Sequence, residues 1–114
     1  MKVQRCHELL KVKHPVLNGV ETCFLRDLRG KKVEDLNLRI FTIQPGTENP
    51  LHTHAYSHDL FVIRGTGIVR LENGEQRISE GDVASIASDE PHAFANDSEE
   101  VLQFLCMDCT VTES

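Results

Sequence analysis

Short apolar stretches separated by turn residues recur along most of the chain, and this pattern predicts β-strands. Residues 36–44 alternate, with Leu38 and Ile40 on one face of an extended chain and Phe41 and Ile43 on the other. The other predicted strands are 60–63, 68–71, 76–78, 83–86 and 101–107, with a shorter piece around Phe94. Turn signals at intervals of roughly ten residues are typical of an all-β sandwich or barrel.

The turns carry their own sequence signals. Pro45-Gly46 ends the first predicted strand, and Asn73-Gly74 is a strong signal for a two-residue hairpin. Helical periodicity is nearly absent, since residues 6–12 could form one turn at most. We therefore expect an all-β fold with little or no helix.

Some predicted strands are apolar on both faces, as the run Leu60-Phe61-Val62-Ile63 shows. One face can fill the interior, and the other must be covered by a second sheet or a second subunit. For so short a chain we expect the cover to be a second copy, in a homodimer. Alternation also makes Phe41, Ile43, Leu60, Phe94 and Phe104 candidates for the wall of an apolar cavity.

Composition narrows the classes of partner. The 114 residues predict one domain, 1–114, and 18 acidic against 12 basic residues give a net charge of −6. This charge argues against nucleic acid, because phosphate binding needs a clustered basic face, and Arg29-Gly30-Lys31-Lys32 reads as a solvated turn. No apolar run is long enough to cross a membrane, and the N-terminus resembles no signal peptide, so we expect a cytoplasmic protein.

The four cysteines are expected to be reduced in that compartment. Cys106 and Cys109 match a CxxC spacing, but residues three apart on a strand point to opposite faces and share a metal poorly. Cys106 is then either a small buried hydrophobe or, if it faces inward beside Phe104, a pocket residue open to oxidation.

Four of the six histidines lie between residues 52 and 92 and form the candidate chemistry. On an extended segment His52 and His54 project from the same side, and His58 follows four residues later. Antiparallel pairing could return His92 across the barrel to meet them. Neutral imidazole is a common ligand for transition metals, so these four residues predict a metal site, whereas His14 and His7 read as ordinary histidines.

The surrounding spacing strengthens that prediction. Gly46, five residues, His52-x-His54, three residues, His58, six residues and Gly65 resemble the first cupin motif, G-x5-H-x-H-x3,4-E-x6-G. Gly81, ten residues, His92, three residues and Asn96 resemble the second, G-x5-P-x-G-x2-H-x3-N. The motifs span 46–65 and 81–96.

The chain departs from these motifs at two places. Ala87 and Asp89 replace the proline and glycine of the second motif, which affects a turn and leaves the histidine untouched. His58 stands where the first motif has its glutamate ligand, and Asp59, one residue later, is a rival for that role. The six-residue spacing to Gly65 favours His58.

The resemblance extends to a subgroup of small bacterial cupins with four histidine ligands, manganese as the described metal, and a cysteine in the last strand that Cys106 would match. It implies a jelly-roll β-barrel (a double-stranded β-helix), a homodimer, and one divalent metal per chain bound by His52, His54, His58 and His92. Manganese or iron is favoured; nickel, cobalt, copper and zinc are the alternatives.

Such a site predicts a function. Four neutral imidazoles leave the full charge of a divalent ion, which makes it a strong Lewis acid. The first hypothesis is a dioxygenase-like or peroxide-using oxidoreductase acting on a small organic molecule. The alternatives are a metal-dependent sugar isomerase or epimerase and a non-catalytic sensor of a small molecule or metal. No general base stands out, although Tyr56, Asp59 and Glu90 are near in sequence.

Overall fold

The computed structural model describes residues 11–14, 17–26 and 36–110, and the regular elements in these ranges are all β-strands. They are β1 (Val12–Lys13), β2 (Val20–Arg26), β3 (Leu36–Ile43), β4 (Tyr56–Arg64), β5 (Thr66–Leu71), β6 (Gly74–Ser79), β7 (Val83–Ile86), β8 (His92–Ala95) and β9 (Leu102–Thr110). The prediction of an all-β fold is confirmed for this part of the chain. No helix in it could span a membrane.

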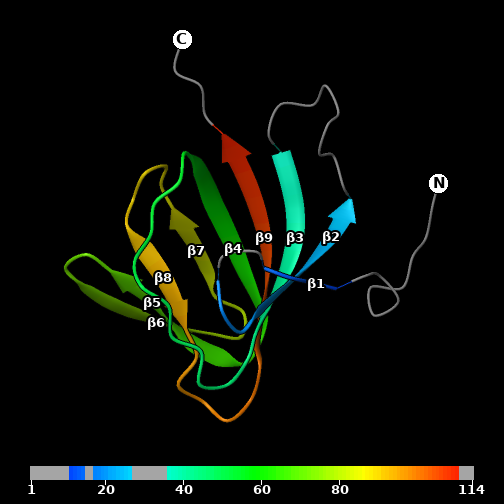
Figure 1. Ribbon diagram of the computed structural model, residues 1–114, viewed down its shortest axis with the longest axis vertical. Coiled ribbons are helices and arrows are strands. Elements are labelled where there is room, and N and C mark those ends of the chain that lie inside the picture. The colour runs from blue at the N-terminus through cyan, green and yellow to red at the C-terminus, as the bar shows by residue number, and fades with distance from the viewer. Residues whose placement is uncertain (1–10, 15–16, 27–35, 111–114) are drawn as a thin grey trace.

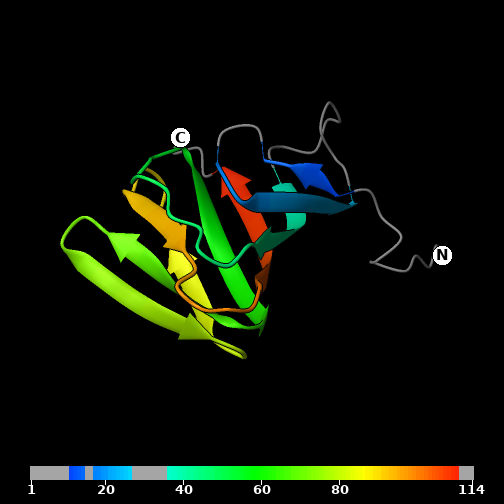
Figure 2. The ribbon, with the colours of Figure 1, turned by 60° about the horizontal axis from the view of Figure 1, so that its bottom comes forward.

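Two antiparallel sheets make up the fold (Figures 1 and 2). The larger has the strand order β1-β2-β3-β9-β4-β7, and the smaller has the order β6-β5-β8. β9, the last strand in sequence, lies between β3 and β4 and pairs with both along most of its length. Residues far apart in the chain therefore meet on the inner face of the larger sheet.

The inner face follows from the two-residue period of the strands. Phe41 on β3 pairs with Phe104 on β9, and Val62 on β4 lies opposite the same residue. These side chains join one buried apolar core with residues of the smaller sheet and of β7, such as Val69, Ile78, Phe94 and Ile86. All five proposed cavity residues lie in this core, and their role as a cavity wall stays a prediction.

The outer face of the larger sheet is also apolar. Leu38, Met107, Phe61 and Val83 are exposed there, on the four adjacent strands β3, β9, β4 and β7. Val83 is the most open of them, with 72% of its surface accessible. The two-faced apolar character expected from the sequence is thus present, with one face in the core and the other uncovered in the single chain.

Several strands differ from their predicted extents. β4 begins at Tyr56 rather than at Leu60, so His58 lies inside the strand and not before it. β2 was not predicted, and β1 places Val12 in a short strand instead of the end of a helical turn. The predictions for residues 6–10, which include His7, and for the basic segment 29–32 lie outside the described residues.

The altered turn of the second motif keeps its backbone shape without glycine. Asp89 has a φ of 62°, the left-handed conformation that glycine adopts most easily, and its N–H donates to the carbonyl of His54 at 2.9 Å. The turn before His92 is therefore tied to the segment that carries His54. The replacement leaves His92 in place, as expected.

Candidate metal centre

The four histidines come from three places in the fold. His52 and His54 lie in the connection between β3 and β4, His58 lies on β4, and His92 begins β8. The backbone brings the first and last together, because the N–H of each of His52 and His92 donates to the carbonyl of the other, at 3.0 and 3.1 Å. Antiparallel pairing thus returns His92 to the other histidines, as the sequence suggested.

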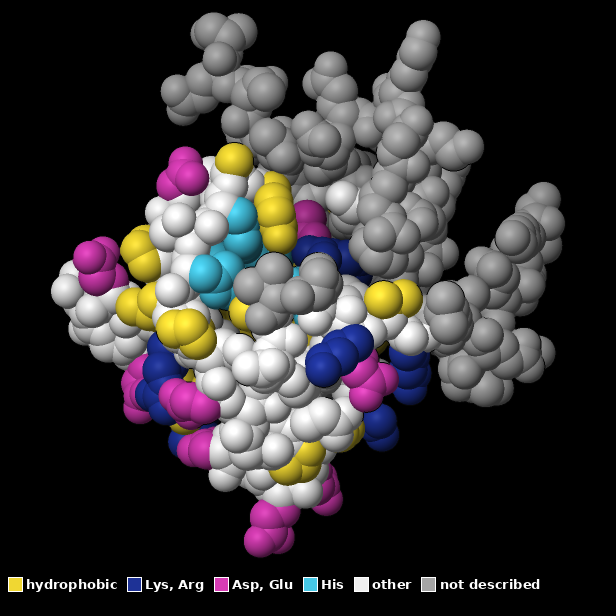
Figure 3. Space-filling model, viewed as in Figure 1, with side chains coloured by type: hydrophobic (Ala, Val, Ile, Leu, Met, Phe, Trp, Pro, Cys, Tyr) yellow, Lys and Arg dark blue, Asp and Glu magenta, His cyan; other side chains and the backbone are white. Residues whose placement is uncertain are grey.

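Their imidazole rings converge. Ring centroids are 4.6 Å apart for His52 and His92, 4.8 Å for His54 and His92, and 4.6 Å for His54 and His58. Ligand nitrogens of His52, His54 and His92 lie within 4.8 Å of one another, and Nε2 of His58 is 2.9 Å from Nε2 of His54. Figure 3 shows histidine side chains at the surface beside apolar groups. His52 and His54 are half-buried, while His58 and His92 are buried.

Hydrogen bonds fix which ring nitrogen faces the cluster. Nδ1 of His54 donates to the carbonyl of Tyr56, and Nδ1 of His92 donates to the carbonyl of Glu90, each at 2.7 Å. Nδ1 of His58 donates to Oδ1 of Asp108 at 2.5 Å. Because a neutral imidazole carries one N–H, the Nε2 atoms of these three residues present lone pairs to one another.

Burial favours the neutral form of His52, His54 and His92. It lowers the pKa of His92 to about 4, and it is the main cause that lowers the pKa of His52 and of His54. Neutral imidazole is the form that binds metal, so the ligand state is already present near pH 7.

A divalent transition metal fits this donor set. Nε2 of His92 and Nδ1 of His52 are buried and have no hydrogen-bond partner within the described residues. The facing lone pairs of His54 and His58 also need a cation between them.

A second buried group lies behind His58. Asp108 on β9 accepts hydrogen bonds from His58 and from the thiol of Cys106, and its other oxygen pairs with Arg39 on β3. Burial opposes ionisation of Asp108, but the His58 hydrogen bond and the Arg39 charge outweigh it and hold its pKa below the ordinary value. Burial, and then the Asp108 charge, raise the pKa of Cys106, so this thiol stays protonated.

The structure separates the remaining candidate residues. Asp59 is exposed on β4 and accepts a hydrogen bond from Ser85 at 2.7 Å, so it points away from the cluster that His58 joins. Glu90 caps the backbone N–H of Ala87, also away from the rings. Tyr56 does face the cluster, since its ring stacks on that of His54 with the centroids 3.7 Å apart and an interplanar angle of 4°.

The two cysteines of the last strand differ in what can be said of them. Cys106 faces inward, as one alternative required, while the side chain of Cys109 lies outside the described residues.

His14 lies near the cluster but outside it. Its ring contacts Phe41 edge-on, and its Nδ1 accepts a hydrogen bond from the N–H of Leu17 at 3.0 Å. Burial first, then the positive charge of Arg39, lower the pKa of His14. It is absent from both groups of side chains whose ligand atoms converge.

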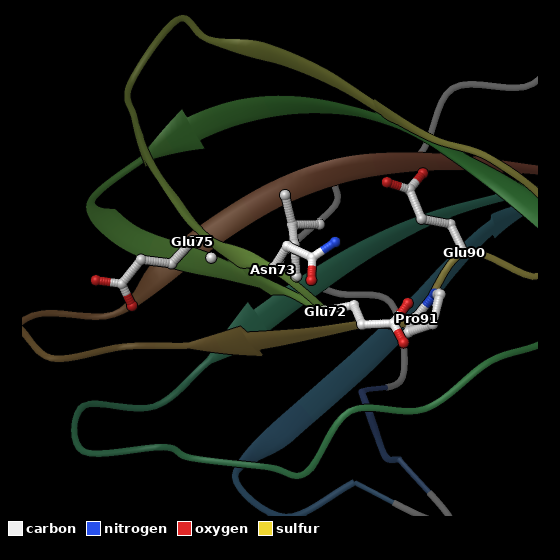
Figure 4. A pocket seen from close by; sticks show the side chains of 7 residues that line it. Glu72, Asn73, Glu75, Glu90 and Pro91 are labelled. Atoms are coloured by element: carbon white, nitrogen blue, oxygen red, sulfur yellow. The ribbon is translucent and has the colours of Figure 1, made fainter.

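A separate cavity of about 390 Å³ lies at the β5–β6 turn (Figure 4). Glu72, Glu75 and Glu90 contribute to its wall, together with Asn73 and Pro91. None of the four clustered histidines lines it. Glu75 pairs with Arg70, and Glu90 bonds to Ala87, so these carboxylates serve surface contacts.

The sequence reasoning found the four histidines but missed Asp108 and Arg39. These two residues are 69 positions apart and lie on strands joined only through the sheet register. The signal available was a charged residue in line with the apolar inner positions: Arg39, two positions before Phe41, and Asp108, two positions after Cys106 and one beyond the predicted strand 101–107.

Comparisons with known proteins agree with this geometry. A family model described as "Cupin domain" matches residues 39–108. No curated protein matches this chain.

Solved structures share the fold. The polyketide cyclase RemF from Streptomyces resistomycificus matches with a TM-score of 0.81 and 21% identity over 100% of this chain and 87% of its own. A predicted oxalate decarboxylase from Thermotoga maritima matches with a TM-score of 0.82 and 22% identity over 96% of this chain and 100% of its own. A sugar phosphate isomerase from Silicibacter pomeroyi matches with a TM-score of 0.75 and 19% identity over 97% of this chain and 76% of its own. At these identities the likeness establishes a shared jelly-roll fold, and the differing names leave the chemistry open.

Proposed function

Because this chain belongs to the cupin domain family, we propose that it binds one divalent transition metal through His52, His54, His58 and His92 and acts as an oxidoreductase on a small organic molecule. The observation that carries the proposal is the convergence of four imidazole rings, among which Nε2 of His92 is buried and has no hydrogen-bond partner in the part of the chain that the structure describes. Manganese or iron is the proposed metal, because imidazole suits transition metals and a metal that takes six ligands would keep positions free for a substrate.

The protein residues hold and shape this centre. When bound, the metal supplies Lewis acidity and, for manganese or iron, redox chemistry with oxygen or peroxide. The histidines contribute no negative charge, and the nearby carboxylate of Asp108 is balanced by Arg39. The centre therefore keeps a net positive charge, which favours substrates with anionic or strongly polar oxygen groups. Tyr56, stacked on His54, forms part of the rim that such a substrate meets.

The metal content of the purified protein tests the ligand set. We expect about one manganese or iron per chain in the unmodified protein, measured by elemental analysis after expression in metal-balanced medium. His58→Ala is expected to reduce this content sharply. His14→Ala and Asp59→Ala are matched controls, because one removes a histidine outside the cluster and the other the rival ligand, and both should retain metal. Absence of metal from every protein, even after reconstitution, would rule out the proposed centre.

Turnover assays separate the proposed reaction class from the alternatives. Consumption of oxygen or peroxide by the metal-loaded protein, dependent on an oxidisable carboxylate or enol, would support the oxidoreductase. Oxygen-independent turnover of a sugar or keto acid would instead support an isomerase. Saturable binding of small molecules without turnover would support a sensor.

We also propose that the protein forms a homodimer in the cytoplasm through the outer face of the larger sheet. The exposed side chains of Leu38, Met107, Phe61 and Val83 lie on adjacent strands and form a contiguous apolar surface. A second copy of the chain would cover this surface, which explains why these strands are apolar on both faces.

A further inference from the structure

We propose that Asp108 is a positioning residue of the metal centre, which fixes the ring of His58 and thereby sets the affinity of the site and its choice of metal. This inference rests on the metal centre proposed above. Asp108 is 2% exposed and lies directly opposite His58 in the pairing of β9 with β4. Its carboxylate is therefore placed by the sheet register and not by a flexible loop.

The contact acts on the side of the ring away from the cluster. Oδ1 of Asp108 accepts the Nδ1–H of His58 at 2.5 Å, which leaves the lone pair of Nε2 directed at the cluster. A carboxylate partner also raises the electron density of the imidazole and makes it a stronger ligand. Phe41 and Phe94 contact the same ring edge-on, at centroid distances of 6.3 and 6.0 Å, and restrict its rotation.

This anchor differs in kind from those of the neighbouring ligands. His54 and His92 donate to the backbone carbonyls of Tyr56 and Glu90, which no side-chain substitution removes. Among the four clustered histidines, His58 is the one whose Nδ1–H is held by a side chain. The strength of this ligand can therefore be changed by substitution at a single position on another strand.

Arg39 completes the arrangement. Its guanidinium pairs with Oδ2 of Asp108 and lies over the ring of Phe41, 4.6 Å from the centroid. The pair is buried, with the two side chains 11% and 3% exposed. Arg39 thus orients the carboxylate and offsets its charge, so that Asp108 supports His58 without adding negative charge to the centre.

The ligand atoms of His58, Cys106 and Asp108 also lie within 4.8 Å of one another, which raises the question of a second metal. A metal there would have to replace the Nδ1 proton of His58 and the thiol proton of Cys106, both of which are donated to Oδ1 of Asp108. The existing hydrogen bond and ion pair already satisfy these atoms. The group is therefore better explained as support for the first centre.

Metal titration of Asp108→Asn, with Asp59→Asn as the matched control, tests the inference. The control removes a carboxylate one residue from His58 on the outer face of the same strand. We expect Asp108→Asn to weaken the binding of Mn²⁺ and Co²⁺ by 10- to 100-fold and to shift the visible absorption of the Co²⁺ protein, while Asp59→Asn changes neither. Unchanged affinity and an unchanged Co²⁺ spectrum in folded Asp108→Asn would overturn the inference.

Asp108→Asn removes the buried ion pair between Asp108 and Arg39 and can therefore unfold the protein. The double variant Arg39→Gln/Asp108→Asn removes both charges and gives a second test. We expect it to melt cooperatively in circular dichroism and still to bind metal more weakly than the unmodified protein. Binding equal to that of the unmodified protein would again contradict a positioning role. Failure of the unmodified protein to bind any metal is a different result, since it refutes the proposed centre itself.

Discussion

The side-chain amide of Asn96 donates a hydrogen bond to the carbonyl of Ile43, 53 residues away, at 3.0 Å. The same Nδ2 donates to the carbonyl of Glu100 at 2.8 Å, and Oδ1 accepts from the N–H and hydroxyl of Ser98. Asn96 is 1% exposed. The asparagine that closes the second motif therefore joins the end of β3 to the turn between β8 and β9.

Asn96→Ala is expected to lower the free energy of unfolding by roughly 2 kcal/mol, because the buried carbonyl of Ile43 loses its donor and the carbonyl of Glu100 loses one of two. Urea denaturation measures this loss. Asp97→Asn, which removes only the exposed pair with Arg77, is the control and should cost less than about 1 kcal/mol. An equal effect of both substitutions would show that the buried amide has no special role.

The two glycines of the first motif are expected to differ in their tolerance of alanine. Both have positive φ, 77° at Gly46 and 85° at Gly65. A Cβ at Gly46 meets nothing within 4 Å, whereas a Cβ at Gly65 would collide with the carbonyl of Val101. Gly46→Ala should therefore cost about 1 kcal/mol of stability from backbone strain, and Gly65→Ala several times more. Thermal melts of the two variants provide the comparison.

The stability of the metal-free protein should fall as the pH drops from about 6.5 to about 4. Burial lowers the pKa of His92 to about 4, so in this range the unfolded chain binds a proton that the folded chain excludes. Stability is then complete above pH 6.5, and the loss from this residue reaches about 3 kcal/mol by pH 4. His52 and His54 act in the same direction.

Denaturation at several pH values, with His92→Gln for comparison, tests this dependence. The variant should show a shallower slope between pH 6.5 and 4. The lowered pKa of Asp108 produces its own loss only at still lower pH, so the two effects are separable. A slope that His92→Gln leaves unaltered would assign the effect to other groups.

Metal binding should stabilise the fold. At a free metal concentration about 100 times the dissociation constant, binding adds about 2.7 kcal/mol, which corresponds to an increase in Tm of roughly 10 °C or more for a chain of this size. Differential scanning calorimetry with Mn²⁺, with and without a chelator, measures the shift. His92→Ala should lose most of it. A shift of equal size in that variant would mean that the metal binds elsewhere.

The proposed dimer is expected to dissociate when charge is placed on the outer face. Phe61→Lys/Val83→Lys introduces two ammonium groups on adjacent positions of β4 and β7. Light scattering coupled to gel filtration should then report a monomer in place of a dimer. Val12→Lys, at an exposed apolar position on β1 at the other edge of the sheet, should leave the dimer intact. A monomeric unmodified protein would refute this interface.

The sequence predicted most strands because alternation and turn residues are local signals. The Asn73-Gly74 hairpin and the inward face of Phe41 and Ile43 are examples. The start of β4 was not predicted, because Tyr56, Ser57 and His58 lack the alternation of apolar and polar residues that marks a strand. Their inward positions carry the histidine cluster and not the apolar core. These polar residues were therefore interpreted as a loop, although their pairing with β9 makes them part of a strand.

The residues of the candidate site also fall into those that local sequence signals predict and those that depend on long-range strand pairing. The spacing of His52, His54 and His58 could be read from the chain, and the motif likeness supplied His92. The link of Asp108 and Arg39 to His58 could not be predicted, because it depends on the placement of β9 between β3 and β4, a long-range pairing without a local signature. Asp89 shows the opposite case, in which a departure from the motif left the backbone shape unchanged.

The four histidines are divided between two sheets, since His58 belongs to the larger sheet while His92 belongs to the smaller one and holds His52 by its backbone. An ion held by all four would be a cross-link between the sheets. Its release would then require the sheets to separate at that end of the barrel, so the rate of metal exchange would follow the rate of this local opening. Local opening is less costly than global unfolding, so the bound ion would exchange slowly while the rest of the fold stays intact.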